Sequence, residues 1–145
     1  MDFTVKSFDE LKTSELYEIL KSRTEVFLLE QNIVCQDMDD VDYESYHFFI
    51  KEGNRVIAYL RAYYTDRENK IVKIGRVLTL SHGNGMGRTL MDNTITEIKR
   101  LFECKKVIVS AQKQAEGFYK KCGFKTVSDE YLEEGIPHVK MELLM

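Results

Sequence analysis

Residues 75–92 of this chain read G-R-V-L-T-L-S-H-G-N-G-M-G-R-T-L-M-D. An apolar run with strand character stops at a glycine-rich turn, and a helical pattern starts directly after it. Glycine has no Cβ atom, so Gly83, Gly85 and Gly87 let a ligand approach the backbone and allow positive φ. The first N–H groups of the helix lack an intrahelical acceptor and lie at its positive dipole end. The stretch therefore predicts an anion site, most often one for phosphate.

Length and composition predict a single domain over residues 1–145, with 43% hydrophobic residues available for a core. The net charge of −3 gives no reason to expect a nucleic-acid partner. No apolar stretch reaches the ~18 residues of a membrane span, and the N-terminus lacks the pattern of a signal peptide. Three widely spaced cysteines suit reduced thiols in a cytoplasmic protein better than disulfides or a metal site.

Hydrophobic periodicity predicts a mixed α/β (α+β) domain. We expect a helix over 14–30 that Ser14 caps, a long helix from the glycines to about residue 103, and a short one that Gly123 ends. Residues 46–80 should form an antiparallel meander, because their connections are too short for crossovers. The helix after them is a crossover, so the next strand should be parallel to the last one of the meander. Six or seven strands are expected, at 3–8, 46–51, 55–64, 70–80, 105–110, 124–127 and 138–144, with a polar segment at 130–135.

A segment without periodicity, residues 31–43, carries Asp37, Asp39, Asp40 and Asp42. One interpretation is a loop whose carboxylates are simply solvated. The other is a loop that attracts a cationic substrate.

Two common phosphate motifs are missing from the glycine turn. A P-loop needs G-x-x-x-x-G-K-[ST], and no Gly-Lys-Ser/Thr occurs in the chain. A dinucleotide fingerprint needs G-x-G-x-x-G in a first βαβ unit, whereas these glycines follow a meander in the register G-x-G-x-G. The turn alone therefore does not identify the phosphate ligand.

A second pattern follows the turn: Gln112-x-x-Ala115-x-x-Phe118-Tyr119-x-x-x-Gly123-Phe124. Together with H-G-N-G-M-G at 82–87, it resembles the two central motifs of the GNAT superfamily of N-acetyltransferases. Those motifs read [Q/R]-x-x-G-x-[G/A] and N-x-x-A-x-x-x-Y-x-x-x-G-F. Segments 23–31 and 131–138 extend the resemblance to the ElaA-type branch, over nearly the whole chain. His82 departs from the Gln or Arg that the family prefers, and the segment 79–81 before it is shorter than usual and lacks proline.

The resemblance implies a GNAT-like domain with helices on both faces of its sheet and acetyl-CoA, as cosubstrate, in a cleft where two parallel strands splay apart. Pantetheine would pair with the edge of the strand around Val77 and Thr79, and an amide near Leu78 would polarise the thioester carbonyl. No metal is implied. The cofactor-binding residues so implied are Val77, Leu78, Thr79, His82, Gly83, Asn84, Gly85, Met86, Gly87, Arg88, Gln112, Phe118 and Tyr119.

Three side chains are the catalytic candidates. Tyr119 holds the family's position for the acid that protonates the leaving thiolate, although a buried structural tyrosine would fit the same helical face. His47 and His138 are candidate bases, because an imidazole pKa of ~6.5 suits proton uptake near neutrality. Either histidine could instead be structural, and the other options are Glu30, Asp40 or a water relay. Two strand arginines, Arg61 and Arg76, should face the substrate cleft or solvent.

The leading hypothesis is an acetyl-CoA-dependent N-acetyltransferase that acts by direct attack of a primary amine, in a small molecule or a peptide. The alternative is a non-catalytic acyl-CoA-binding or sensing module. A nucleotide-phosphate enzyme ranks third, because the P-loop lysine is missing. Residues 31–46 and 130–138 should line the acceptor side, where their acidity favours a cationic amine. No nucleic-acid or membrane partner is expected, and the oligomeric state is left open, with a homodimer among the options.

Overall fold

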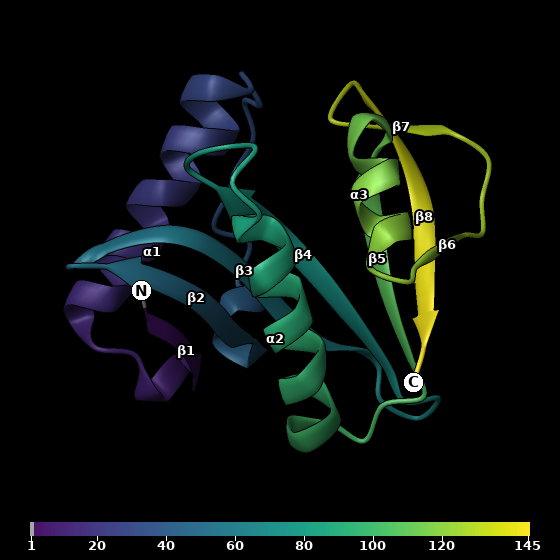
Figure 1. Ribbon diagram of the computed structural model, residues 1–145, viewed down its shortest axis with the longest axis horizontal. Helices are drawn as coiled ribbons and strands as arrows, with labels where there is room; N and C mark the ends of the chain where they lie inside the picture. The colour runs from purple at the N-terminus through teal and green to yellow at the C-terminus, as the bar shows by residue number, and fades with distance from the viewer. Residues whose placement is uncertain (1) are drawn as a thin grey trace.

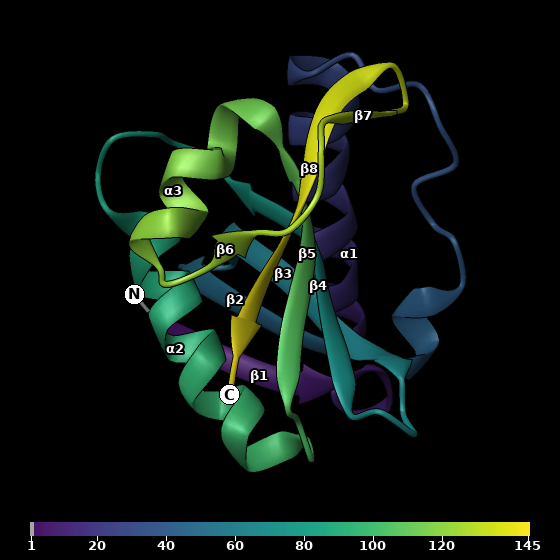
Figure 2. The same ribbon diagram turned by 90° about the vertical axis from the view of Figure 1, so that its right-hand side faces the viewer.

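The computed structural model describes residues 2–145, which form one eight-stranded sheet with helices on both faces (Figures 1 and 2). The strands follow the order β1-β2-β3-β4-β5-β8-β6, and β7 pairs with β8. Their bounds are β1 Asp2–Ser7, β2 Tyr46–Glu52, β3 Arg55–Asp66, β4 Ile71–Thr79, β5 Lys106–Gln112, β6 Lys125–Thr126, β7 Tyr131–Glu133 and β8 Ile136–Leu144. The α-helices are α1 Thr13–Arg23, α2 Met86–Leu101 and α3 Glu116–Lys121, with a π-helix η2 at Thr24–Glu30 and 3-10 turns η1 Phe8–Glu10, η3 Val41–Glu44 and η4 Lys113–Ala115.

The expected antiparallel meander of β2, β3 and β4 is confirmed, and so is the parallel pairing of β4 with β5. The strand count was one too low, because residues 131–133 form β7 instead of a polar loop. Tyr131 pairs with His138 and Glu133 with Ile136. Glu134 and Gly135 both have positive φ, the geometry of a two-residue hairpin turn. Within the part of the chain described, β7 pairs only with β8. Its residues are mostly exposed and lie in a polar segment, so no strand pattern marks them in the sequence.

The first helix begins at Thr13, and its cap differs from the predicted Ser14. The Glu15 carboxylate accepts a hydrogen bond from the Lys12 amide at 2.8 Å, so an acidic side chain in the first turn does the capping. After Arg23 the helix widens into η2, which ends at Glu30 as expected. None of the helices within residues 2–145 is long and apolar enough to cross a membrane.

The sheet separates two apolar clusters. On one face, α2 and α3 contribute Leu90, Met91 and Tyr119 to the larger cluster; on the other, α1 and η2 contribute Ile19 and Val26 to the smaller one. Figure 2 shows α2 and α3 on one side of the strands and α1 on the other. The residues of β5 alternate: Val107, Val109 and Ala111 are buried in the larger cluster, so Ser110 and Gln112 lie on the opposite face. This alternation decides which side chains meet at the site.

The parallel strands β4 and β5 separate halfway along their length. They are paired from Ile71 opposite Lys106 to Ile74 opposite Val109. Beyond that point β4 remains paired only with β3, and β5 only with β8. A β-bulge causes the change in direction: Arg61 faces Gly75, Tyr59 faces Leu78, and Arg76 between them has φ 54°. Figure 1 shows the two strands close at one end and apart at the other.

Candidate active site

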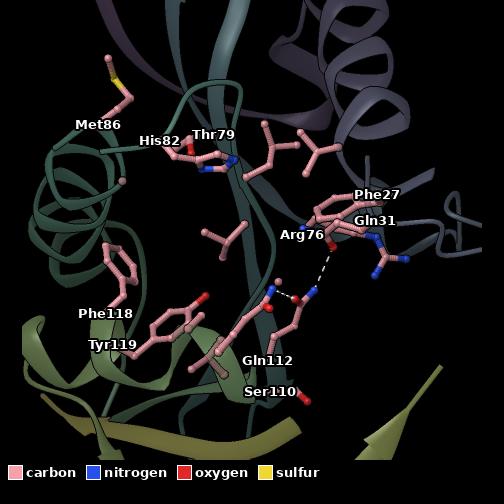
Figure 3. Close-up of a pocket in the computed structure, with 18 of the residues that line it drawn as sticks. Phe27, Gln31, Arg76, Thr79, His82, Met86, Ser110, Gln112, Phe118 and Tyr119 are labelled. Carbon is pink, nitrogen blue, oxygen red and sulfur yellow. Dashed lines mark hydrogen bonds between the residues drawn. The ribbon is translucent and has the colours of Figure 1, made fainter. Parts of the chain in front are cut away.

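A cavity of about 700 Å³ opens where β4 and β5 diverge (Figure 3). Its walls come from η2, the residues just after it, β4, the glycine turn, the end of β5, α3 and the β7–β8 hairpin. Every residue that we expected at the acetyl-CoA site lines it: Val77, Leu78, Thr79, His82, Gly83, Asn84, Gly85, Met86, Gly87, Arg88, Gln112, Phe118 and Tyr119. Of the two candidate bases, His138 lines the cavity and His47 does not.

The glycine turn gives the cavity a wall of backbone amides. Gly83 and Gly85 have φ of 78° and 76°, and a Cβ on either would meet open space, so the turn itself requires glycine. The Thr89 amide donates to the Gly85 carbonyl at 3.0 Å and closes the first turn of α2. Gly87 and Arg88 come before Thr89 in the helix, so their amides have no acceptor within α2 and point out of its N-terminus.

Two side chains shape the same turn. The Met86 amide donates to Asn84 Oδ1 at 3.1 Å, so this amide is held by the protein itself. Gly87 has an ordinary helical φ, but a Cβ there would lie 3.3 Å from Cε1 of Phe118. Gly87 is therefore small because α3 packs directly against the start of α2.

The edge of β4 that faces the cavity is open beyond the splay. The Leu80 amide donates to the Ile57 carbonyl on β3 at 2.9 Å. Because strand amides point alternately to either side, the Leu78 amide also faces β3, whereas those of Val77 and Thr79 face the cavity. An extended ligand could pair with this edge as an added strand would.

Tyr119 stands on α3 with its ring in the core and its hydroxyl directed into the cavity (Figure 3). The side chain is 5% exposed, and its ring contacts those of Phe118 and Phe124 in edge-on arrangements. Burial raises the pKa of the Tyr119 hydroxyl above its ordinary value, so the group stays protonated at neutral pH and can donate a proton.

Two polar contacts join η2 and the residue after it to other walls of the site, and sequence reasoning missed both. Gln112 on β5 donates from Nε2 to Oε1 of Gln31, just after η2, at 3.0 Å (Figure 3). His82 Nε2 lies 3.1 Å from Oε1 of Glu30, so this candidate base is already in contact with a histidine of the glycine turn. The partners are 81 and 52 residues apart, and no local pattern links them.

Three of the four aspartates in the acidic loop are paired with arginines of the protein, so the loop is more than a solvated segment. Arg23 and Arg61 are 1% and 2% exposed and share Oδ1 of Asp42, at 2.8 and 3.0 Å. The Asp39 carboxylate also receives both terminal nitrogens of Arg61, at 2.8 and 2.7 Å. Three aspartates and three arginines form this network: Asp37, Asp39, Asp42, Arg23, Arg61 and Arg76.

The network decides where the strand arginines lie. Arg61 faces neither the cleft nor solvent, because it is buried among carboxylates. Arg76 lines the cavity, with Nε 2.9 Å from Asp37 Oδ1. The fourth aspartate, Asp40, is exposed at φ 69° before η3 and does not line the cavity.

His47, expected as a candidate base, is buried in the protein outside the cavity. Its side chain is 1% exposed, with Nδ1 2.8 Å from the Tyr59 hydroxyl and Nε2 3.0 Å from the Asp42 carbonyl. Burial is the largest effect on its pKa, which is lowered. Both ring nitrogens are thus occupied away from the cavity, so His47 cannot reach a substrate there.

His138 lies on β8, at the opposite wall of the cavity from α2. It is 6% exposed, and its Nδ1 is 2.7 Å from the Ile136 carbonyl. Its Nε2 is 3.5 Å from Oε2 of Glu133 on β7. Ser110 donates to the other oxygen of that carboxylate at 3.2 Å and is itself hydrogen-bonded to the Tyr131 hydroxyl.

The cysteines are all free, in agreement with the expectation of reduced thiols. Burial raises the thiol pKa of Cys104 and of Cys122, so both are poor nucleophiles. Residues 2–145 hold no group of three or more side chains arranged to bind a metal ion.

Known proteins share this sequence and architecture. A family model described as an acetyltransferase (GNAT) domain matches residues 11–145. A UPF0039 protein of Schizosaccharomyces pombe is 37% identical over 147 residues, which cover 99% of this chain and 97% of the relative. Protein ElaA of Escherichia coli is 35% identical over 136 residues, which cover 91% of this chain and 89% of ElaA. The crystal structure of an acyl-CoA N-acyltransferase from Pseudomonas aeruginosa matches with a TM-score of 0.90 at 35% identity, over 98% of this chain and 99% of that one.

The family model spans the glycine turn, the splayed strands and the tyrosine helix, which together form the cavity. The chain therefore belongs to the GNAT family of acetyltransferases, on the branch that includes ElaA.

Proposed function

We propose that the protein transfers an acetyl group from acetyl-CoA to a primary amine, by direct attack of the amine on the thioester. One observation carries the proposal: a single cavity has the Tyr119 hydroxyl on one wall and the Ser110, Gln112 and His138 side chains on another. Tyr119 belongs to the α3 face of the sheet, and Ser110 and Gln112 to the opposite face. Donor and acceptor can thus approach from opposite faces and meet at the splay.

The residues present fit the coenzyme. The outward amides of Gly87 and Arg88, together with those of Gly83 and Gly85, would hold the pyrophosphate at the positive end of α2. Asn84 Oδ1 competes for the Met86 amide, so binding there would require the Asn84 side chain to release it. The cavity-facing edge of β4, at Val77 and Thr79, would hydrogen-bond the amides of the pantetheine arm.

Bound acetyl-CoA supplies an acyl group activated as a thioester. The Val77 amide faces the cavity, so it takes the role that we expected of an amide near Leu78 and donates to the thioester carbonyl oxygen. Tyr119 protonates the departing sulfur, and its raised pKa keeps the needed proton in place at neutral pH. General acid help of this kind typically contributes about 10²–10⁴-fold in rate.

Release of free thiol from acetyl-CoA tests the proposal, with a broad panel of primary amines as acceptors. We expect turnover by the wild type and a kcat lower by about 10²–10⁴-fold in Tyr119→Phe, with CoA affinity unchanged. Tyr17→Phe is the matched control, because that ring is 68% exposed and lies outside the cavity. Tight CoA binding with equally negligible turnover in wild type and Tyr119→Phe would instead favour the sensing module.

A further inference from the structure

The β7–β8 hairpin places an imidazole and a carboxylate together in the wall of the cavity. Glu133 and His138 both line it, with Oε2 of the first 3.5 Å from Nε2 of the second. His138 is 6% exposed. This pair takes no part in binding the coenzyme as proposed above, and it lies beside the last residues of β5, where His138 is paired with Gln112.

Hydrogen bonding defines which nitrogen of His138 carries the proton. A carbonyl oxygen can only accept, so the 2.7 Å contact with Ile136 requires a hydrogen on Nδ1. In the neutral ring, Nε2 is therefore a bare acceptor. It faces the Glu133 carboxylate, which is also an acceptor, so in this neutral form the gap between them lacks the hydrogen that a hydrogen bond needs.

The Glu133 carboxylate is oriented by Ser110 on β5 and, through Ser110, by Tyr131 on β7. Ser110 must donate to Oε1 of Glu133, because a carboxylate has no hydrogen to give. The Tyr131 hydroxyl must then be the donor in its contact with Ser110. Tyr131 and Glu133 are two residues apart on β7 and project to one face, so the hairpin delivers this relay as a unit.

We propose that Glu133 and His138 form the binding site for the ammonium group of the acceptor, which makes the substrate a cationic primary amine. This inference rests on the proposed function. An ammonium has three N–H donors and one positive charge, so it satisfies the bare Nε2 and the carboxylate at once. The three arginines of the neighbouring network are paired with aspartates. Glu133 lies in the cavity wall and is not part of that network.

The same pair then prepares the nucleophile. His138 Nε2 accepts one proton from the ammonium, and Glu133 stabilises the imidazolium so formed. The free amine forms the new C–N bond while the C–S bond of the thioester breaks. Tyr119 protonates the departing thiolate, and the second proton of the amine, lost as the amide forms, restores the Tyr119 hydroxyl. His138 releases the first proton to solvent.

Histidine NMR with n-butylamine as the probe tests the binding step directly. The chain has three histidines, so ¹³Cε1-labelled protein gives three signals, assigned by single substitutions. In the CoA complex, we expect n-butylamine to shift the His138 signal and to leave that of buried His47 in place. Glu133→Gln should weaken this response by roughly tenfold to hundredfold, the loss of a charged hydrogen bond. Glu130→Gln, on the same segment but outside the cavity wall, is the matched control and should respond as the wild type does.

Kinetics separates the roles of the pair. Glu133→Gln should raise the KM for amines by roughly tenfold to hundredfold and lower kcat less than His138→Gln does, which should lower kcat by about 10²–10⁴-fold. Ser110→Ala, which acts through the carboxylate, should raise KM in the wild type but add nothing in the Glu133→Gln background.

Two results would overturn the inference while sparing the enzyme: a His138 signal that ignores saturating n-butylamine, or wild-type KM values in Glu133→Gln. Failure of the proposed function would look different. In that case the wild type would release no thiol from acetyl-CoA with any amine.

Discussion

Asp42 is the carboxylate that Arg23 and Arg61 share. Asp42→Asn therefore tests how much the buried ion pairs of the acidic loop, residues 31–43, contribute to stability. The Oδ1 atom of Asp42 accepts hydrogen bonds from Arg23 and Arg61, at 2.8 and 3.0 Å. Both guanidinium groups are almost fully buried, at 1% and 2% exposure. Burial by itself raises the pKa of Asp42, but the two arginines outweigh it, and the pKa is lowered overall. The carboxylate is therefore charged at neutral pH, and the substitution removes that charge from between two buried cations.

Removing one partner of a buried ion pair costs about 3–5 kcal/mol, because the remaining charge is left uncompensated. The asparagine side chain in Asp42→Asn would keep one oxygen acceptor, and Asp37 and Asp39 still contact the two arginines. We therefore expect a loss of about 3 kcal/mol, at the lower end of the range for a broken buried pair. A domain of this kind is stable by only about 5–15 kcal/mol, so the loss is a large part of the total.

Urea unfolding followed by circular dichroism measures this loss, since the chain has no tryptophan. The slope of free energy against urea should stay unchanged while the midpoint falls. Asp40→Asn is the matched control: Asp40 is exposed at φ 69°, a conformation that asparagine accepts, so its effect should stay within about 0.5 kcal/mol. A loss below about 1 kcal/mol in Asp42→Asn, or losses of equal size in both variants, would refute the reasoning, because a broken buried pair costs more than that.

Three further outcomes are expected. Gly85→Val should abolish CoA binding in calorimetry while the protein stays folded, because valine is strained at φ 76° in a turn that must admit the ligand. Gly87→Val should do the same by a different route, since its Cβ would press on the Phe118 ring at 3.3 Å; wild-type affinity in both variants would contradict the assigned turn. The hydrogen bond from Arg61 lowers the pKa of Asp39 to about 2, so its contribution is present above about pH 4 and is lost as the pH falls toward 2. Acid unfolding between these values should be shallower in Asp39→Asn, and profiles that superimpose would show that the pair contributes nothing.

Several parts of the site could be read from local sequence alone. The turn from β4 into α2 is encoded by an apolar run, glycines at alternate positions and a helical repeat, all within 18 residues of one another. The face of α3 that carries Phe118 and Tyr119 follows from helical spacing in the same way. These features depend on backbone conformation and on neighbours one or two turns away, so the residue types report them directly.

Other parts had no local signal. The two histidines looked equivalent in sequence, and packing decided between them: His47 is enclosed by Tyr59 and the Asp42 carbonyl, whereas His138 reaches the cavity. The acidic loop had two plausible interpretations, and neither included the ion pairs that its aspartates form with Arg23 and Arg61 from other elements.

The sequence by itself determined that this protein has an antiparallel meander, a glycine turn before a long helix, a parallel strand after that helix and then a short helix that carries Tyr119. Only the tertiary structure decided which polar groups meet across the cavity, such as Gln31 with Gln112, 81 residues apart. The physical reason is the range of the interactions. Turns, caps and helical faces depend on neighbouring residues, whereas a buried charge or an unsatisfied acceptor depends on whatever the folded chain brings beside it.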